Sequence, residues 1–93
     1  MTAPIPPEAR PRLARGVRLR EDPARGRFVL LAPERVFDTN PTAVEVLRRC
    51  DGERTFAAIV DDLATAFNAD RMRVAADAAA LLGELATKRM VEL

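Results

Sequence analysis

The stretch "NPTAVEVLRRCDGERT", residues 40–55, decides how the chain is interpreted, because it holds a helix with both of its ends marked. Asn40 and Pro41 are residue types that helices favour at the N-cap and at the first helical position. Apolar residues then follow at the i, i+3, i+4, i+7 spacing of one helical face: Ala43, Val46, Leu47 and Cys50. The Asp51–Gly52 pair has the composition of a tight turn and is predicted to end the helix.

The lone cysteine, Cys50, is interpreted as a core residue, because it lies on the apolar face of this helix. A buried cysteine behaves as a small hydrophobic residue. The negative end of a helix dipole raises the pKa of a thiol, whereas a reactive cysteine needs a lowered pKa. A redox or nucleophilic role is the alternative to this interpretation.

Composition excludes several kinds of chemistry. The chain has 93 residues, which is the size of one small domain, and 48% of them are hydrophobic. It has no His and one Cys, so a zinc site within the chain is nearly excluded, and nucleophilic catalysis that depends on His is excluded outright. No Gly-rich phosphate loop is present, and the carboxylates are scattered. We therefore predict that the protein is not an enzyme and holds no metal and no cofactor.

Charge and cysteine content favour a soluble protein of the cytoplasm. Fifteen basic and fourteen acidic residues give a net charge of +1, which is low for binding to a polyanion. No apolar run approaches the length needed to cross a bilayer, and a single Cys cannot form an intrachain disulfide. We therefore expect a cytoplasmic protein that binds no membrane and no nucleic acid.

The chain before Asn40 is divided into a tail and a small sheet. Residues 1–12 are rich in proline and are predicted to be a disordered tail, so that one domain spans residues 13–93. Three strands are predicted at residues 17–22, 27–32 and 35–39, because each carries alternating or continuous apolar residues and turn residues separate them. A simple meander places the third strand at an edge of the sheet.

The remainder of the chain is predicted to form two further helices. Thr55 is the expected N-cap of the second helix, and the third runs from about Arg71 to Lys88. One face of the third helix is assigned to the core and carries Val74, Ala78, Leu81, Leu82 and Leu85. A second face is smooth and either packs on another helix or contacts a partner: Met72, Ala75, Ala79, Gly83 and Ala86. The predicted fold class is α+β, a winged-helix-like domain in which a three-stranded antiparallel sheet precedes three helices.

The sequence resembles the PqqD family, small proteins of pyrroloquinoline quinone biosynthesis. Members carry an "N-x-T-A" pattern followed by "L-x-x-C-D-G-x-x-T", and the matching residues here are Asn40, Thr42, Ala43, Leu47, Cys50, Asp51, Gly52 and Thr55. The resemblance covers about residues 13–93. One departure is that the usual "K-G-L" near the end of the family is here Lys88, Arg89 and Met90.

The resemblance implies that the chain is a peptide chaperone. Members bind the ribosomal precursor peptide PqqA and present it to PqqE, a radical S-adenosylmethionine enzyme that forms a Glu–Tyr crosslink. In related recognition domains the leader segment of the precursor joins the third strand and packs between that strand and the third helix. The resemblance therefore implies two partners, PqqA and PqqE.

The candidate peptide-binding residues lie on the third strand and on the third helix. They are Arg35, Val36, Phe37, Asp38, Thr39, Arg71, Arg73, Val74, Asp77, Ala78 and Leu81. An edge strand offers unpaired backbone groups to another chain, and adjacent side chains such as Val36 and Phe37 point to opposite faces. The resemblance also implies acidic precursors, for which Arg35, Arg71 and Arg73 are the expected partners.

The sequence is compatible with two other interpretations. A winged-helix domain can bind DNA, although the third helix offers few side chains suited to base edges. An open strand edge and a smooth helix face also permit a homodimer.

Overall fold

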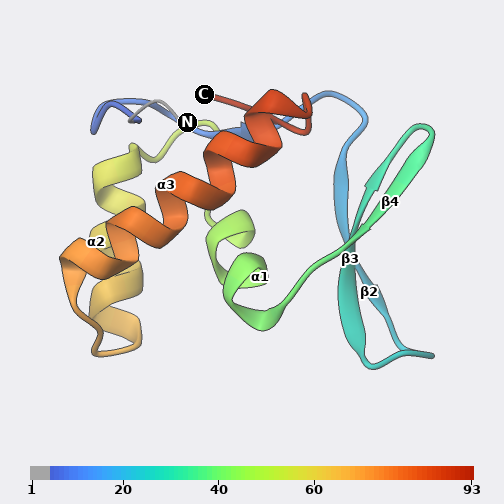
Figure 1. The fold of residues 1–93 in the computed structure, drawn as a ribbon, viewed down its shortest axis with the longest axis horizontal. Helices are drawn as coiled ribbons and strands as arrows, with labels where there is room; N and C mark the ends of the chain where they lie inside the picture. Colours follow the sequence, from blue (N-terminus) through green and yellow to red (C-terminus); the bar gives the residue numbers. More distant parts are fainter. Residues whose placement is uncertain (1–4) are drawn as a thin grey trace.

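The computed structural model describes residues 5–93, and its elements follow the predicted order of a small sheet and then three helices (Figure 1). The strands are β1 Arg12–Leu13, β2 Arg18–Asp22, β3 Arg27–Ala32, β4 Arg35–Asp38 and β5 Val91–Glu92. The helices are α1 Pro41–Arg48, α2 Phe56–Ala66 and α3 Arg71–Thr87. The predicted fold class, an α+β domain with a three-stranded antiparallel sheet before three helices, is confirmed.

The three-stranded sheet is a meander with the order β2-β3-β4. Its central strand is the most apolar, and Leu30 in it is 1% exposed. Leu30 is paired with Phe37 of β4, and these side chains face the helices. The neighbouring residue, Val36, points to the other face and is 65% exposed. The predicted alternation of Val36 and Phe37 across the sheet is therefore confirmed.

Two helices begin at the predicted caps. The Oδ1 atom of Asn40 accepts a hydrogen bond from the backbone N–H of Ala43 at 2.8 Å, which starts α1. The hydroxyl of Thr55 accepts one from the N–H of Ala58 at 3.1 Å, which starts α2. Each bond satisfies a donor that the first turn of a helix leaves unpaired. The local sequence thus determines where both helices start.

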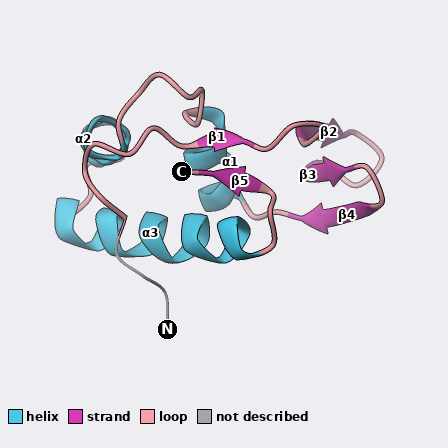
Figure 2. Cartoon of the chain, turned by 90° about the horizontal axis from the view of Figure 1, so that it is seen from above, coloured by secondary structure: helices cyan, strands magenta, loops and turns pink. Residues whose placement is uncertain are grey.

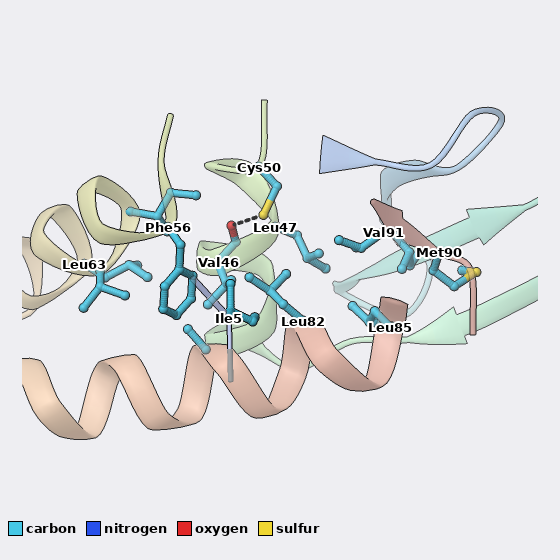
Figure 3. Close-up of a cluster of buried hydrophobic side chains, with 14 of the residues drawn as sticks. Ile5, Val46, Leu47, Cys50, Phe56, Leu63, Leu82, Leu85, Met90 and Val91 are labelled. Carbon is cyan, nitrogen blue, oxygen red and sulfur yellow. Dashed lines mark hydrogen bonds between the residues drawn. The ribbon is translucent and has the colours of Figure 1, made fainter. Parts of the chain in front are cut away.

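The three helices bury their apolar faces against one another (Figure 3). Cys50 lies in this core at 7% exposure, and its thiol donates to the carbonyl of Val46 at 3.3 Å. Burial raises the pKa of Cys50 to about 12, and the charge of Asp51 adds to the increase. The interpretation of Cys50 as a core residue is therefore confirmed.

The segment before β1 differs from its prediction. Residues 1–12 are predicted from composition to be disordered, but in the structure residues 5–12 lie against the domain. Ile5 is 8% exposed and belongs to the core cluster (Figure 3). Residues 1–4 lie outside the described part of the chain, so the prediction of a disordered tail is not tested there.

Backbone hydrogen bonds hold this N-terminal segment in place. The N–H of Phe56 donates to the carbonyl of Ala9 at 2.7 Å, and the N–H of Gly52 donates to that of Pro11 at 3.0 Å. The chain then enters β1, which pairs antiparallel with β5 near the C-terminus (Figure 2). The two ends of the described chain are therefore joined by strand pairing between β1 and β5.

The backbone conformation at Gly52 explains why the family pattern has glycine at this position. Its φ angle is +79°, which side-chain-bearing residues rarely adopt. A Cβ atom at this position would lie 3.3 Å from the side chain of Arg12. The positive φ of the turn after α1 therefore favours glycine, and a side chain there would also crowd the N-terminal segment that crosses it.

The faces of α3 differ in part from the sequence assignment. Ala78, Leu82 and Leu85 are buried as predicted, but Val74 and Leu81 are only half-buried. On the smooth face Met72 is 80% exposed, whereas Ala75 and Ala79 are half-buried and packed against the core. This packing favours the helix-contact interpretation for the central part of the smooth face.

Candidate functional site

Two adjacent hollows lie along α3, between this helix, β4 and α1, and we name them together the α3 groove. Its narrow part has a volume of about 150 Å³, and its wide part has a volume of about 750 Å³. Both parts are lined by Asn40, Ala43 and Leu81, so they are adjacent at the point where β4 leads into α1. This arrangement places an edge strand of the sheet directly beside an open hollow.

The narrow part lies between β4 and the C-terminal half of α3. Besides the three shared residues, it is lined by Leu30, Phe37, Asp38, Thr39, Leu47, Glu84, Leu85 and Lys88. The Arg35 guanidinium lies 5.4 Å from the centre of the Phe37 ring, and the Lys88 ammonium lies 5.2 Å from it. Arg35 also donates to the carbonyl of Lys88 at 3.2 Å. These contacts connect the start of β4 to the end of α3.

The wide part lies between α1, the end of α2 and the N-terminal half of α3. Besides the shared residues, it is lined by Pro41, Thr42, Glu45, Val46, Leu63, Phe67, Ala69, Asp70, Arg73, Val74, Asp77 and Ala78. Its surface is mainly apolar, and the Phe67 side chain is 57% exposed within it. A volume of this size falls in the range typical of ligand pockets.

Two hydrogen bonds fix the middle of the groove, where β4 becomes α1. The Thr39 hydroxyl donates to the carbonyl of Phe28 on β3 at 2.7 Å. The next residue, Asn40, caps α1. The junction is therefore bonded to β3 on one side and to the first turn of α1 on the other. These two bonds restrict how β4 and α1 lie relative to each other.

Charged groups lie at both parts of the groove. Arg73 and Asp77 form an exposed pair at 4.0 Å, and Lys88 pairs with Glu84 at 3.0 Å. Asp70 has no ion pair among the described residues. Exposed pairs of this kind contribute little to stability and rearrange readily. They are therefore available to a bound ligand.

The structure brings most of the predicted site residues together. Those that line the α3 groove are Phe37, Asp38, Thr39, Arg73, Val74, Asp77, Ala78 and Leu81. Arg35 stands at the mouth of the narrow part, over Phe37. Val36 contributes through its position on the edge strand, because its side chain points to the opposite face of the sheet.

Arg71 does not line the groove. Its guanidinium pairs with Asp61 of α2, so it faces away from β4. Position in the first turn of α3 explains the difference, because Arg71 and Arg73 lie about 200° apart around the helix axis. The expected role of Arg71 as a partner of acidic precursor residues therefore receives no support from its placement.

Several lining residues were not predicted. They are Asn40, Ala43, Phe67, Glu84 and Lys88, among others. Asn40 and Ala43 carry strong helix signals that say nothing about a groove. Phe67 reads as the last residue of an apolar stripe, and only its 57% exposure distinguishes it from a core residue.

The described residues contain no group of three or more His, Cys, Asp or Glu side chains placed to hold a metal ion. None of the helices in residues 5–93 is both long enough and apolar enough to cross a membrane.

The fold and the groove define a class of protein: a small α+β domain whose open strand edge lies beside a helix-lined hollow. The family model described as "Coenzyme PQQ synthesis protein D (PqqD)" matches residues 27–91. The chain belongs to the PqqD family, as its sequence pattern predicts.

Named relatives agree with this assignment. A "PqqA binding protein" of Rhodopseudomonas palustris (strain HaA2) is 49% identical over 81 residues, which cover 87% of this chain and 79% of the relative. The "Bifunctional coenzyme PQQ synthesis protein C/D" of Methylorubrum extorquens is 48% identical over 82 residues, which are 88% of this chain but only 22% of that protein. The matched region therefore also occurs within a longer chain.

Two solved structures share the fold. The solution NMR structure of the PqqD truncation of Methylobacterium extorquens PqqCD, described as a stand-alone RiPP recognition element, has a TM-score of 0.84 and 44% identity, covering 99% of this chain and 97% of its own. The crystal structure of PqqD from Xanthomonas campestris has a TM-score of 0.62 and 42% identity, covering 87% and 90%.

Proposed function

We propose that this chain binds a PqqA-type precursor peptide during pyrroloquinoline quinone synthesis and presents it to the radical S-adenosylmethionine enzyme PqqE. The binding step is supported by the relatives named for PqqA binding and by the recognition element of similar fold. The presentation step is supported by the family resemblance. The role is one of binding and needs neither catalysis nor a cofactor of its own.

The open edge of β4 beside the α3 groove is the observation that carries this proposal. Strand addition draws affinity from backbone hydrogen bonds at such an edge and specificity from side-chain pockets beside it. Here both features adjoin, because Phe37 of β4 is also part of the groove lining. A bound strand would place every second side chain in the narrow part, against Phe37, Leu81 and Leu85.

The register of the sheet indicates which backbone groups a peptide would use. A two-residue turn joins β3 to β4, and Ala32 pairs with Arg35 next to it. In such a hairpin we expect that pair to exchange both of its hydrogen bonds with β3. Alternation then directs the backbone groups of Val36 and Asp38 to the open edge. We infer that an antiparallel peptide pairs with these two residues.

Amide hydrogen exchange during a titration with synthetic PqqA tests the binding proposal. The N–H groups of Val36 and Asp38 should become protected, because they gain acceptors. Amides at the outer edge of β2, at Leu19 and Glu21, should exchange at an unchanged rate. Protection at β2 with no change at β4 would refute binding at the β4 edge.

Presentation is tested separately with purified PqqE. The rate of Glu–Tyr crosslink formation in PqqA should rise when this chain is added. A variant that does not bind PqqA should give no increase. An equal increase with both proteins would contradict presentation through the bound peptide.

A further inference from the structure

We propose that the wide part of the α3 groove takes a large apolar residue of the bound peptide, located three to five residues before the segment that pairs with β4. This inference rests on the proposed function. It concerns a second recognition step, in which an apolar side chain next to a basic group anchors the peptide upstream of the added strand.

The size of the groove carries the first step of the argument. β4 borders only the narrow part, whose volume is about 150 Å³. The wide part, about 750 Å³, is lined by residues after β4 and by none of β4 itself. Strand pairing therefore leaves most of the groove unfilled, and a peptide that fills it must continue past the end of β4.

The direction of the peptide follows from the register. β4 runs from Arg35 to Asp38, and the wide part begins beyond Asp38, at Asn40. An antiparallel strand runs the other way, so its N-terminal side lies at the wide part. The anchor therefore precedes the paired segment in the peptide sequence.

The distance sets the spacing. Leu81 lies where the two parts join, and Val74 lies in the wide part, seven residues earlier on α3. This corresponds to about 10 Å along a helix. An extended peptide covers that distance in about three residues. An anchor three to five residues upstream therefore reaches the centre of the wide part.

The chemistry of the lining selects the anchor. The wide part offers an exposed aromatic ring at Phe67 and half-buried Val74, which together favour a large aliphatic or aromatic side chain. Its rim carries Asp70, which has no ion pair among the described residues, and Asp77, whose pair with Arg73 is at the limiting distance of 4.0 Å. A Lys or Arg beside the anchor would meet these carboxylates.

A cycle of protein and peptide changes tests the anchor. The protein variant is Phe67→Ser, which is expected to fold because the side chain is 57% exposed. Met72→Ser is the matched control, since Met72 is 80% exposed and does not line the groove. The peptides are synthetic PqqA and a form shortened so that the residues upstream of the paired segment are missing. Titration calorimetry measures two dissociation constants, one for each peptide, for the parent protein and for each variant.

We expect Phe67→Ser to weaken binding of the full peptide about 10-fold and to leave binding of the short peptide unchanged, while Met72→Ser changes neither. Equal weakening of both peptides, or no weakening of either, would overturn the anchor. The amide exchange test at Val36 and Asp38 is independent of this result. Protection there with an unaffected Phe67 variant would reject the anchor and retain binding at β4.

Discussion

The two edge strands of the sheet, β2 and β4, offer the same kind of backbone but have different surroundings. Both strands carry charged side chains at exposed positions, a feature that discourages pairing with another chain: Arg18, Arg20 and Glu21 in β2, and Arg35 and Asp38 in β4. β4 lies on the side of the sheet nearest the end of α3, as Figure 2 shows, and borders the α3 groove. Under the proposed function, the groove beside β4 is what distinguishes this edge from that of β2 as a binding site.

The largest expected effect comes from proline at the edge. Val36→Pro removes a backbone N–H that we place at the open edge of β4, and the ring blocks approach of a peptide. We expect at least about a 30-fold loss of PqqA affinity, because a lost backbone hydrogen bond and a steric clash together cost about 2 kcal/mol or more. Titration calorimetry measures the affinity, and circular dichroism checks the fold.

The same substitution on the other edge provides the control. Glu21→Pro removes an N–H that we place at the open edge of β2, and it should leave the affinity for PqqA unchanged. Val36→Ala keeps the backbone and should bind nearly as the parent does. If both proline variants bound PqqA equally well, the distinction between the edges would be lost.

The anchoring of the chain before β2 predicts an effect on stability without an effect on binding. Ile5→Ala should lower the free energy of unfolding by about 2 kcal/mol, because it leaves a cavity in the core where Ile5 is 8% exposed. The sequence alone predicts no change in melting temperature on deletion of residues 1–12. From the structure we expect a clear decrease. Denaturant unfolding of the deletion variant decides between these two expectations. A loss of PqqA affinity in folded Ile5→Ala would show that this segment affects the β4 edge.

The next prediction compares the groove side of α3 with the exposed side of the same helix. Leu81 joins the two parts of the groove, so Leu81→Ala should weaken PqqA binding about 10-fold through loss of apolar contact. Met72→Ala, on the exposed face of the same helix, should have no effect. Equal affinities for the two variants would show that the edge of β4 acts without the groove.

The smallest effect is a dependence of stability on alkaline pH. The pKa of Cys50 is raised to about 12 in the folded chain. The contribution of the protonated thiol to the stability of the folded state is therefore complete below the pKa of an unfolded thiol, and it is lost as the pH rises above that value. We expect the free energy of unfolding to decrease by about 1 kcal/mol between pH 8 and pH 9.5. The chain has no Tyr and no His, which keeps this range clear of their titration.

Cys50→Ala provides the control, because it should remove most of this pH dependence. PqqA affinity in the same variant should be unchanged, since Cys50 lies outside the groove. An unaltered pH dependence would assign the effect to another group. A loss of affinity in folded protein would show that the core and the β4 edge are coupled.

Local signals explain how much of the fold the sequence predicts. Asn40 and Thr55 are capping residues whose hydrogen bonds appear as expected, and the alternation at Val36 and Phe37 follows from strand geometry alone. The prediction for residues 5–12 is wrong because this segment is held by hydrogen bonds to its backbone carbonyls and by the burial of Ile5 and Pro11. Amino-acid composition carries no information on such contacts. A proline-rich segment has the same composition whether it is disordered or bound to the domain.

The candidate site is predicted in part, for a related reason. Helical spacing assigns Val74 and Leu81 to the core face, and the strand-addition model assigns them to the site. Their half-burial agrees with both. The direction of Arg71 and the exposure of Phe67 depend on how α2 and α3 pack, which no local pattern records. The family pattern is divided between the two regions. Asn40, Thr42, Ala43 and Leu47 line the groove, whereas Cys50, Asp51, Gly52 and Thr55 lie outside it.

The way in which the N-terminal segment is held has a consequence for how this domain can be joined to others. Its backbone carbonyls accept from Gly52, Phe56 and Ala57, and almost any residue could supply them. Its sequence can therefore vary at the exposed positions while its length and the buried side chains of Ile5 and Pro11 are kept. None of residues 5–11 lines the groove, so a protein grafted ahead of Ile5 would leave the groove accessible. The domain thus has the properties of a transferable cassette, and the bifunctional Methylorubrum extorquens relative contains a matching region within a much longer chain.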